Sequence, residues 1–163
     1  MGFGIVKLTD LSGDACKIYS VARDGSEDTL LELFIDKFDA QYPKQIDEVL
    51  NKLRFMGFEG GAREGFFRKN EGKPGDGVVA LLNAPNFPLR LYGIRFGTSL
   101  LILGSGGKKG AETRTWQQDN SLREAAEQMI LLSALITQRI KDKEIILVSD
   151  GSIMGDKHFD EEI

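Results

Sequence analysis

The sequence predicts an α+β fold, and three patterns support that prediction. Apolar residues recur at helical spacing over 29–56, alternate at strand spacing over 66–103, and return to helical spacing over 122–141. The chain has 163 residues, 41% of them hydrophobic, which is enough for one sizeable core. We therefore expect a single domain in which helices pack on a central antiparallel sheet.

The N-terminal part starts with two expected strands, at 3–8 and 16–22, separated by turn-forming residues at 12–14. A helix then begins near Thr29, because Thr29 and Glu32 have the spacing of a capping box. Proline at position 43 interrupts this helix and begins a second one, so the two form a helical hairpin.

The middle of the chain predicts an antiparallel meander, because its strand-like runs are joined by short turns. The four expected strands span 66–70, 78–83, 89–96 and 98–103. Arg90 and Arg95 share the third of these strands. Their spacing places them on opposite faces of the sheet unless a bulge intervenes.

The C-terminal part contains a third expected helix at 122–141 and a further strand at 144–149. The last segment, 150–163, carries five acidic residues and one lysine, and we expect it to be a mobile acidic tail. The predicted organisation is one domain over 1–149 followed by this tail.

Composition excludes several kinds of site. Cys16 is the only cysteine, so no disulfide framework exists, and a buried inert thiol is the favoured interpretation. His158 is the only histidine and has no partner at ligand spacing, so the sequence predicts neither a metal site nor a Ser-His-Asp triad. No cofactor is expected. The chain shows no signal peptide and no run long enough to span a bilayer, which predicts a cytoplasmic protein.

Net charge is distributed unevenly along the chain. Residues 57–118 carry nine Lys/Arg and five Asp/Glu, whereas the segments before and after have net charges of −3 and −5. The total is −4. A basic middle between acidic ends is typical of an anion-binding surface, and chance grouping of solvated charges is the alternative.

The basic middle gathers around the segment 104–109, Gly-Ser-Gly-Gly-Lys-Lys, which we expect to be a flexible loop. Cations and an aromatic residue beside such a loop indicate a site for phosphate or RNA. The residues concerned are Arg90, Arg95, Lys108, Lys109, Arg114 and Trp116. A plain hairpin end is the alternative. A P-loop is excluded, because that pattern needs glycine where Ile102 stands and Ser or Thr where Lys109 stands.

Taken together, the chain resembles the RelE/ParE toxin superfamily, and within it the HigB-like, phage-derived branch. The resemblance covers roughly residues 16–140 and rests on element order, on Leu-Arg-Leu-Tyr-Gly-Ile-Arg at 89–95, and on Leu-Ile-Leu-Gly-Ser-Gly-Gly-Lys-Lys at 101–109. It implies a RelE-like fold with a central antiparallel sheet, an N-terminal helical hairpin and a C-terminal helix. It further implies a toxin that cuts mRNA, usually on the ribosome, and that an antitoxin protein silences.

The resemblance also implies roles for individual residues. Arg90 matches the arginine on the meander strand of these toxins, and Lys108 with Lys109 matches their basic junction. The expected catalytic set is Arg90, Lys108, Lys109 and Arg114, and the expected RNA-binding set is Arg68, Lys69, Arg95 and Trp116. Without a usable histidine, a lysine whose pKa is lowered by neighbouring cations serves as the base, and arginine stabilises the transition state.

Structural alternatives stay open for these residues. Arg90 is either solvated or paired with an acid, and the two lysines either bind RNA or keep a hairpin soluble. Trp116 either stacks on a base or anchors a helix, and Tyr92 is expected in the core. The predicted function is therefore the toxin of a type II toxin–antitoxin pair, a metal-independent endoribonuclease. The alternative is a non-catalytic module that binds an acidic partner segment. The acidic tail is expected to cover the basic loop.

Overall fold

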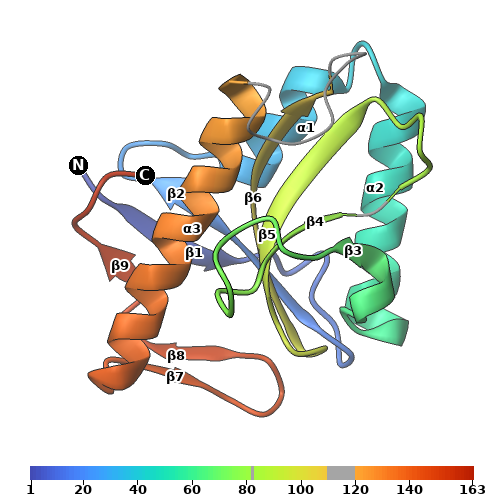
Figure 1. The fold of residues 1–163 in the computed structure, drawn as a ribbon. Coiled ribbons are helices and arrows are strands. Elements are labelled where there is room, and N and C mark those ends of the chain that lie inside the picture. Colours follow the sequence, from blue (N-terminus) through green and yellow to red (C-terminus); the bar gives the residue numbers. More distant parts are fainter. Residues whose placement is uncertain (82, 110–119) are drawn as a thin grey trace.

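The computed structural model describes residues 1–81, 83–109 and 120–163. These residues form an α+β structure with a seven-stranded sheet in the order β3-β4-β5-β6-β2-β1-β9 and a separate two-stranded sheet, β7-β8 (Figure 1). Helices cover both faces of the large sheet. The arrangement is therefore three-layered over much of its width.

Two strands precede the first helix. Strand β1 (Phe3–Lys7) pairs antiparallel with β2 (Lys17–Arg23), as the sequence predicted. Helix α1 (Leu30–Phe38) has Thr29 as its N-cap, and the predicted capping box with Glu32 is present. Helix α2 (Pro43–Phe55) begins at the expected proline and continues into a π-helical turn, Met56–Gly60.

A short 3-10 helix, Glu64–Phe66, leads into four strands. Strand β3 (Phe67–Arg68), β4 (Val78–Leu81), β5 (Leu89–Phe96) and β6 (Leu100–Lys108) form the expected antiparallel meander. The meander is confirmed, but β6 runs to Lys108, so the segment expected as a flexible loop is mostly strand. It stays extended because β5 is long enough to pair with it along its whole length.

The glycines of β6 serve close packing rather than flexibility. The register between β5 and β6 shifts between Leu91 and Gly93, which places two β6 residues opposite one on β5. A Cβ at Gly106 would collide with the Arg90 carbonyl, and one at Gly107 would lie 2.9 Å from the Ser121 hydroxyl oxygen. These positions let β5 and the start of α3 (Asn120–Lys141) approach the strand closely.

The sheet is mixed rather than antiparallel, because β2 pairs parallel with β6. Two strands come before the helix pair, and three short strands follow the third helix. The RelE-like layout predicted from the sequence, with an N-terminal helical hairpin and a C-terminal helix around an antiparallel sheet, is therefore wrong. The local patterns identified the elements, but the neighbours of β2 and β1 depend on segments far away in the chain.

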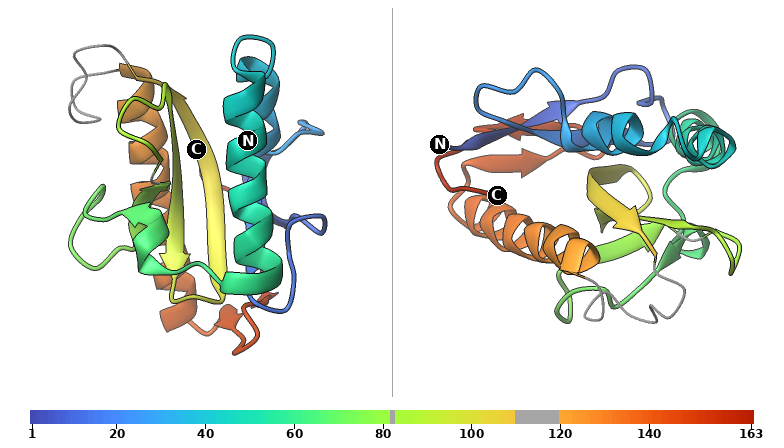
Figure 2. Two further views of the ribbon diagram at one scale, coloured as in Figure 1. Left: turned by 90° about the vertical axis from the view of Figure 1, so that its right-hand side faces the viewer. Right: turned by 90° about the horizontal axis from the view of Figure 1, so that it is seen from above.

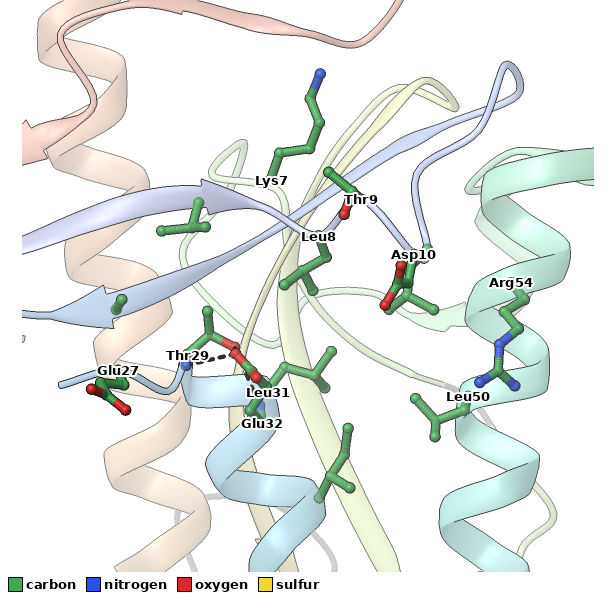
Figure 3. Close-up of a pocket in the computed structure, with 14 residues that line it drawn as sticks. Lys7, Leu8, Thr9, Asp10, Glu27, Thr29, Leu31, Glu32, Leu50 and Arg54 are labelled. Carbon is green, nitrogen blue, oxygen red and sulfur yellow. Dashed lines mark hydrogen bonds between the residues drawn. The ribbon is translucent and has the colours of Figure 1, made fainter.

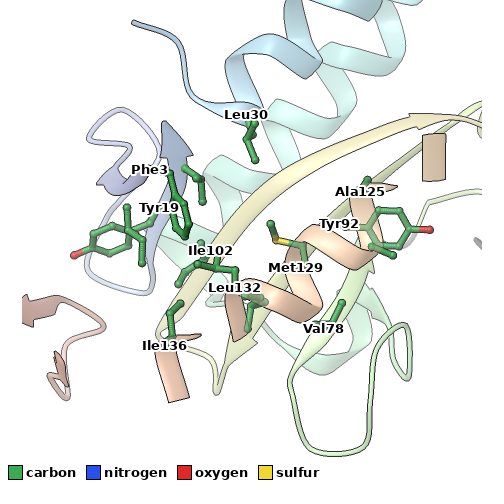
Figure 4. Close-up of a cluster of buried hydrophobic side chains, with 14 of the residues drawn as sticks. Phe3, Tyr19, Leu30, Val78, Tyr92, Ile102, Ala125, Met129, Leu132 and Ile136 are labelled. Atoms are coloured by element: carbon green, nitrogen blue, oxygen red, sulfur yellow. The ribbon is translucent and has the colours of Figure 1, made fainter. Parts of the chain in front are cut away.

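Two cores lie on the two faces of the sheet. Helices α1 and α2 cover one face, and α3 covers the other (Figure 2). Along α3, Met129, Leu132 and Ile136 pack on the strand side chains of that face (Figure 4). Successive side chains of a strand point to opposite faces of the sheet, so neighbouring residues on one strand belong to different cores and pack against different helices.

Residues 150–163 pack against the body of the protein. After β7 (Ile145–Leu147) and β8 (Ile153–Gly155), strand β9 (His158–Phe159) pairs with β1 at one edge of the large sheet. The Phe159 ring is buried and stacks on Phe3 with a centroid separation of 4.9 Å. The expected mobile tail is thus an edge strand, separated from β5 by three other strands, and in this position it does not cover the basic segment.

None of the helices in the described part of the chain combines the length and the apolar character required to traverse a bilayer.

Candidate functional site

A polar cluster lies on the α3 face, at the β3–β4–β5 side of the sheet. Arg68 on β3 is paired with Ala80 on β4, and Ala80 is in turn paired with Tyr92 on β5. Directly paired residues present their side chains to the same face, so Arg68 and Tyr92 flank the small side chain of Ala80. The alanine leaves space between them for other polar groups.

Arg90 and Lys109 join the cluster from β5 and from the end of β6. Arg90 stands two residues before Tyr92 on the same strand and is opposite Gly107 on β6. Lys109 follows Gly107 by two residues, and its backbone N–H donates to the Pro88 carbonyl at 2.8 Å, which extends the ladder. Spacing by two brings the side chains to one face.

Glu71 completes the cluster and was not anticipated from the sequence. The chain leaves β3 through Asn70, whose φ of 65° lies in the left-handed region that asparagine tolerates better than most residues. This turn returns Glu71 toward Arg68, and Glu71 Oε1 lies 3.4 Å from Arg68 Nε. No short motif marks such a contact, since it depends on one backbone conformation.

Three polar atoms of the cluster are buried without a hydrogen-bond partner among the described residues. They are Glu71 Oε1, Arg90 Nη1 and the Tyr92 hydroxyl. Glu71 and Arg90 are each only 5% exposed, and Tyr92 is fully buried. Each unsatisfied group costs about 1–3 kcal/mol, and more when it is charged. Buried polar atoms without a protein partner are satisfied by ordered water, an ion or a ligand, or are used in a reaction, so these three atoms mark a candidate site.

Burial controls the electrostatics of the site. It raises the pKa of Glu71, an effect that Arg68 and Arg90 offset only in part. It raises the pKa of Tyr92 to about 12, although Arg90 is close enough to favour the phenolate. The approach of Arg90 to the Tyr92 hydroxyl is thus an electrostatic contact rather than a well-formed hydrogen bond.

The pKa of Lys109 is lowered, first by its partial burial and then by the positive charges of Arg90 and Arg68. A lowered pKa increases the fraction of neutral amine, which is the form that accepts a proton. The structure therefore brings together three of the predicted cations, Arg68, Arg90 and Lys109. Arg68 is exposed and Lys109 half-buried, whereas Arg90 lies beneath them.

Other predicted residues lie elsewhere. The Lys108 ammonium stands 5.8 Å from the centroid of the Tyr42 ring, at the start of α2 and away from the cluster. Arg95 faces the opposite side of the sheet from Arg90, as alternation predicted, and donates to the Ala62 carbonyl. Lys69 and Arg95 are both within ion-pair distance of Glu64, so those two form a separate charged group.

Arg114 and Trp116 fall outside the described residues. Tyr92 is in the α3-face core as expected, but its hydroxyl points away from the other labelled side chains of that core (Figure 4).

A hollow of about 390 Å³ opens elsewhere, between the end of β1 and helices α1 and α2 (Figure 3). Its floor is apolar, and its rim carries both signs of charge, including Lys7, Asp10 and Arg54. Glu32 within it accepts hydrogen bonds from Thr29 and so belongs to the cap of α1. The hollow contains none of the residues predicted to act on RNA.

The chain matches no protein-family model, no curated protein and no solved structure. Function must therefore be argued from the cluster itself. Two arginines lie beside one carboxylate there, a lysine with a lowered pKa lies beside the arginines, and two of these cations reach solvent. Such a site is suited to binding a phosphate group and to moving a proton beside it.

Proposed function

We propose that the cluster of Arg68, Glu71, Arg90, Tyr92 and Lys109 binds the phosphate backbone of RNA and that the protein is a metal-independent endoribonuclease. The observation that carries this proposal is the grouping of Arg68, Arg90 and Lys109 on one face of the sheet, where the two arginines help to lower the pKa of the lysine. Its biological setting is the toxin half of a type II toxin–antitoxin pair, with mRNA on the ribosome as substrate and an antitoxin protein as partner.

The chemistry assigns one task to each accessible group. Neutral Lys109 accepts the proton of a ribose 2′-hydroxyl, whose oxygen then attacks the adjacent phosphorus. The bond from phosphorus to the 5′ oxygen breaks, leaving a 2′,3′-cyclic phosphate and a 5′-hydroxyl. The protonated lysine or water returns a proton to that leaving oxygen. Arg68 contacts the phosphate, and Arg90 stabilises its growing negative charge from beneath.

A single pair of variants tests the assignment. Lys109→Ala is expected to reduce RNA cleavage by about 10²-fold or more, the usual scale for loss of a general base. Lys108→Ala is the matched control, because its neighbouring ammonium faces Tyr42 instead of the cluster. Cleavage is measured on purified protein with a chelator present, and growth and new mRNA 5′ ends are measured after induced expression.

Burial of Arg90 favours a second candidate, a non-catalytic module in which exposed Arg68 and half-buried Lys109 hold an acidic segment of a partner protein. The same experiment separates the two. Intact growth and uncut RNA with folded wild-type protein would move the conclusion to the binding module. If Lys109→Ala and Lys108→Ala both cleaved RNA as fast as the wild type, Lys109 would have no role in the reaction.

A further inference from the structure

Glu71 is the one acidic side chain among the described residues of the basic cluster, and the ribonuclease chemistry above leaves it without a task. It is held between cations by a local turn: Asn70 in a left-handed conformation returns the chain so that Glu71 Oε1 lies 3.4 Å from Arg68 Nε. Its side chain is 7% exposed, whereas that of Arg68 is 42% exposed. The carboxylate thus lies inside the site, and its arginine partner extends to the opening.

The contact between Arg68 and Glu71 is incomplete. The two charges are within ion-pair distance, but Glu71 Oε1 has no hydrogen-bond partner among the residues that the structure describes. Arg90 Nη1 is a donor in the same condition. A phosphate oxygen is the group that satisfies such donors with two charge-assisted hydrogen bonds, so a bound phosphate competes with Glu71 for the arginines.

We infer that Glu71 tunes which phosphates the cluster accepts, weakening the binding of doubly charged terminal phosphates more than that of the singly charged diester of an RNA backbone. This inference rests on the proposed RNA-binding function. The reason is Coulombic: a ligand next to a buried carboxylate is repelled in proportion to its charge. Without Glu71, the three cations would favour a dianion over a monoanion. Keeping one internal anion reduces that preference, because the carboxylate repels a dianion about twice as strongly as a monoanion, and this part of the selectivity comes from a repulsive element.

Protonation of Glu71 relieves the repulsion. Among the described residues, the charged and titratable groups that face it are Arg68 on β3 and Arg90 and Tyr92 on β5, and Lys109 at the end of β6 lies beside the two arginines. A bound anion stabilises the neutral carboxyl, so binding of a dianion takes up a proton. Dianion affinity in the wild type therefore rises as pH falls, whereas a variant with glutamine at this position lacks that part of the pH dependence.

The experiment compares two probes that keep their charge across the pH range used, dimethyl phosphate with one charge and sulfate with two. Binding is followed by NMR shifts of the Lys109 and Tyr92 signals at constant ionic strength. Glu71→Gln is expected to tighten sulfate binding at least about tenfold more than dimethyl phosphate binding, a conservative scale for one added repulsion in a half-buried site. Glu64→Gln, which removes an exposed carboxylate beside Lys69 and Arg95, is the matched control and leaves the ratio unchanged.

The outcomes separate this inference from the function beneath it. If both probes bind and Glu71→Gln leaves their ratio unchanged, Glu71 does not determine selectivity, while the anion site stands. If neither probe moves the Lys109 or Tyr92 signals, the anion site itself is overturned. If the variant does not fold, the wild type alone tests the inference. A sulfate affinity that does not rise, relative to the dimethyl phosphate affinity, as pH falls to the ordinary glutamate value of 4.5 contradicts the inference.

Discussion

The two sides of the large sheet both carry ionisable side chains, but these side chains differ in burial and in hydrogen bonding. At the β1–β9 edge, the exposed His158 Nε2 lies 3.0 Å from Asp24 Oδ1, and Asp24 also accepts from the Gly2 N–H at 3.0 Å. At the β3–β5 side, Glu71, Arg90 and Tyr92 each have a buried polar atom with no hydrogen-bond partner among the described residues. Satisfied exposed charges fix the end of the chain, whereas unsatisfied buried ones are retained at a cost and so indicate a site.

The largest expected change in stability tests whether the β1–β9 edge serves the stability of the fold. Phe159→Ala removes a ring that stacks on Phe3 and lies under the Arg139 guanidinium at 3.7 Å. We expect the free energy of unfolding to fall by about 3–5 kcal/mol, the usual range for a buried phenylalanine. Urea denaturation measures this loss. Anion binding at the cluster should be unchanged under native conditions, and a matching loss there would show that the two edges are coupled.

A smaller effect is expected at the other edge. Arg90→Met keeps the approximate volume of the side chain but leaves Glu71 with Arg68 as its remaining arginine neighbour, and we expect the free energy of unfolding to fall by about 1–3 kcal/mol. The double variant Arg90→Met/Glu71→Gln should recover part of this loss, because no uncompensated buried charge remains. Denaturation of the three proteins forms a double-mutant cycle. An additive result would mean that the two side chains do not interact.

The smallest effects are opposite pH dependences of stability at the two edges. The pKa of Asp24 is lowered, chiefly by its hydrogen bond with His158, so its stabilising contribution is present above the ordinary value of 3.8 and is lost as pH falls through the folded-state value. Asp24→Asn should remove this acid-side loss. Thermal unfolding of wild type and variant at several acidic pH values measures it.

For Glu71 the sign is reversed. Burial raises its pKa, so the folded state is favoured while the carboxyl is neutral, and stability falls as pH rises above the ordinary value of 4.5. Glu71→Gln should remove that decline in stability with rising pH. The loss of stability at low pH, which comes from Asp24, should stay unchanged. If both variants changed the same side of the profile, the contrast between the edges would be lost.

Features of local origin could be predicted from the sequence. The capping box of Thr29 and Glu32, the proline that begins α2, and the apolar stripe of α3 each depend on residues within a few turns. The predicted helices therefore lie within about two residues of those observed. The spacing of Arg90 and Arg95 likewise sufficed to place them on opposite faces.

Features of distant origin could not be predicted. The parallel pairing of β2 with β6 requires two segments separated by the whole helix pair and meander, and no local signal specifies it. Glu71 enters the cluster only because Asn70 adopts a left-handed conformation. Lys108 and Lys109 are indistinguishable as a dipeptide, and only the register of β6 with β5 directs them to different sides. The composition of the site was thus partly foreseeable, and its geometry was not.

The pairing of β1 with β9 has a consequence for how the chain folds. The Ile153 N–H donates to the Tyr19 hydroxyl across 134 residues, and β9 covers β1 from still farther along the chain. Contacts of such separation must close large loops before they contribute, which slows folding relative to a fold built from local contacts. Until residue 159 has left the ribosome, β1 presents an unpaired edge to other chains. Nascent and truncated forms of this protein are therefore the ones most in need of a chaperone.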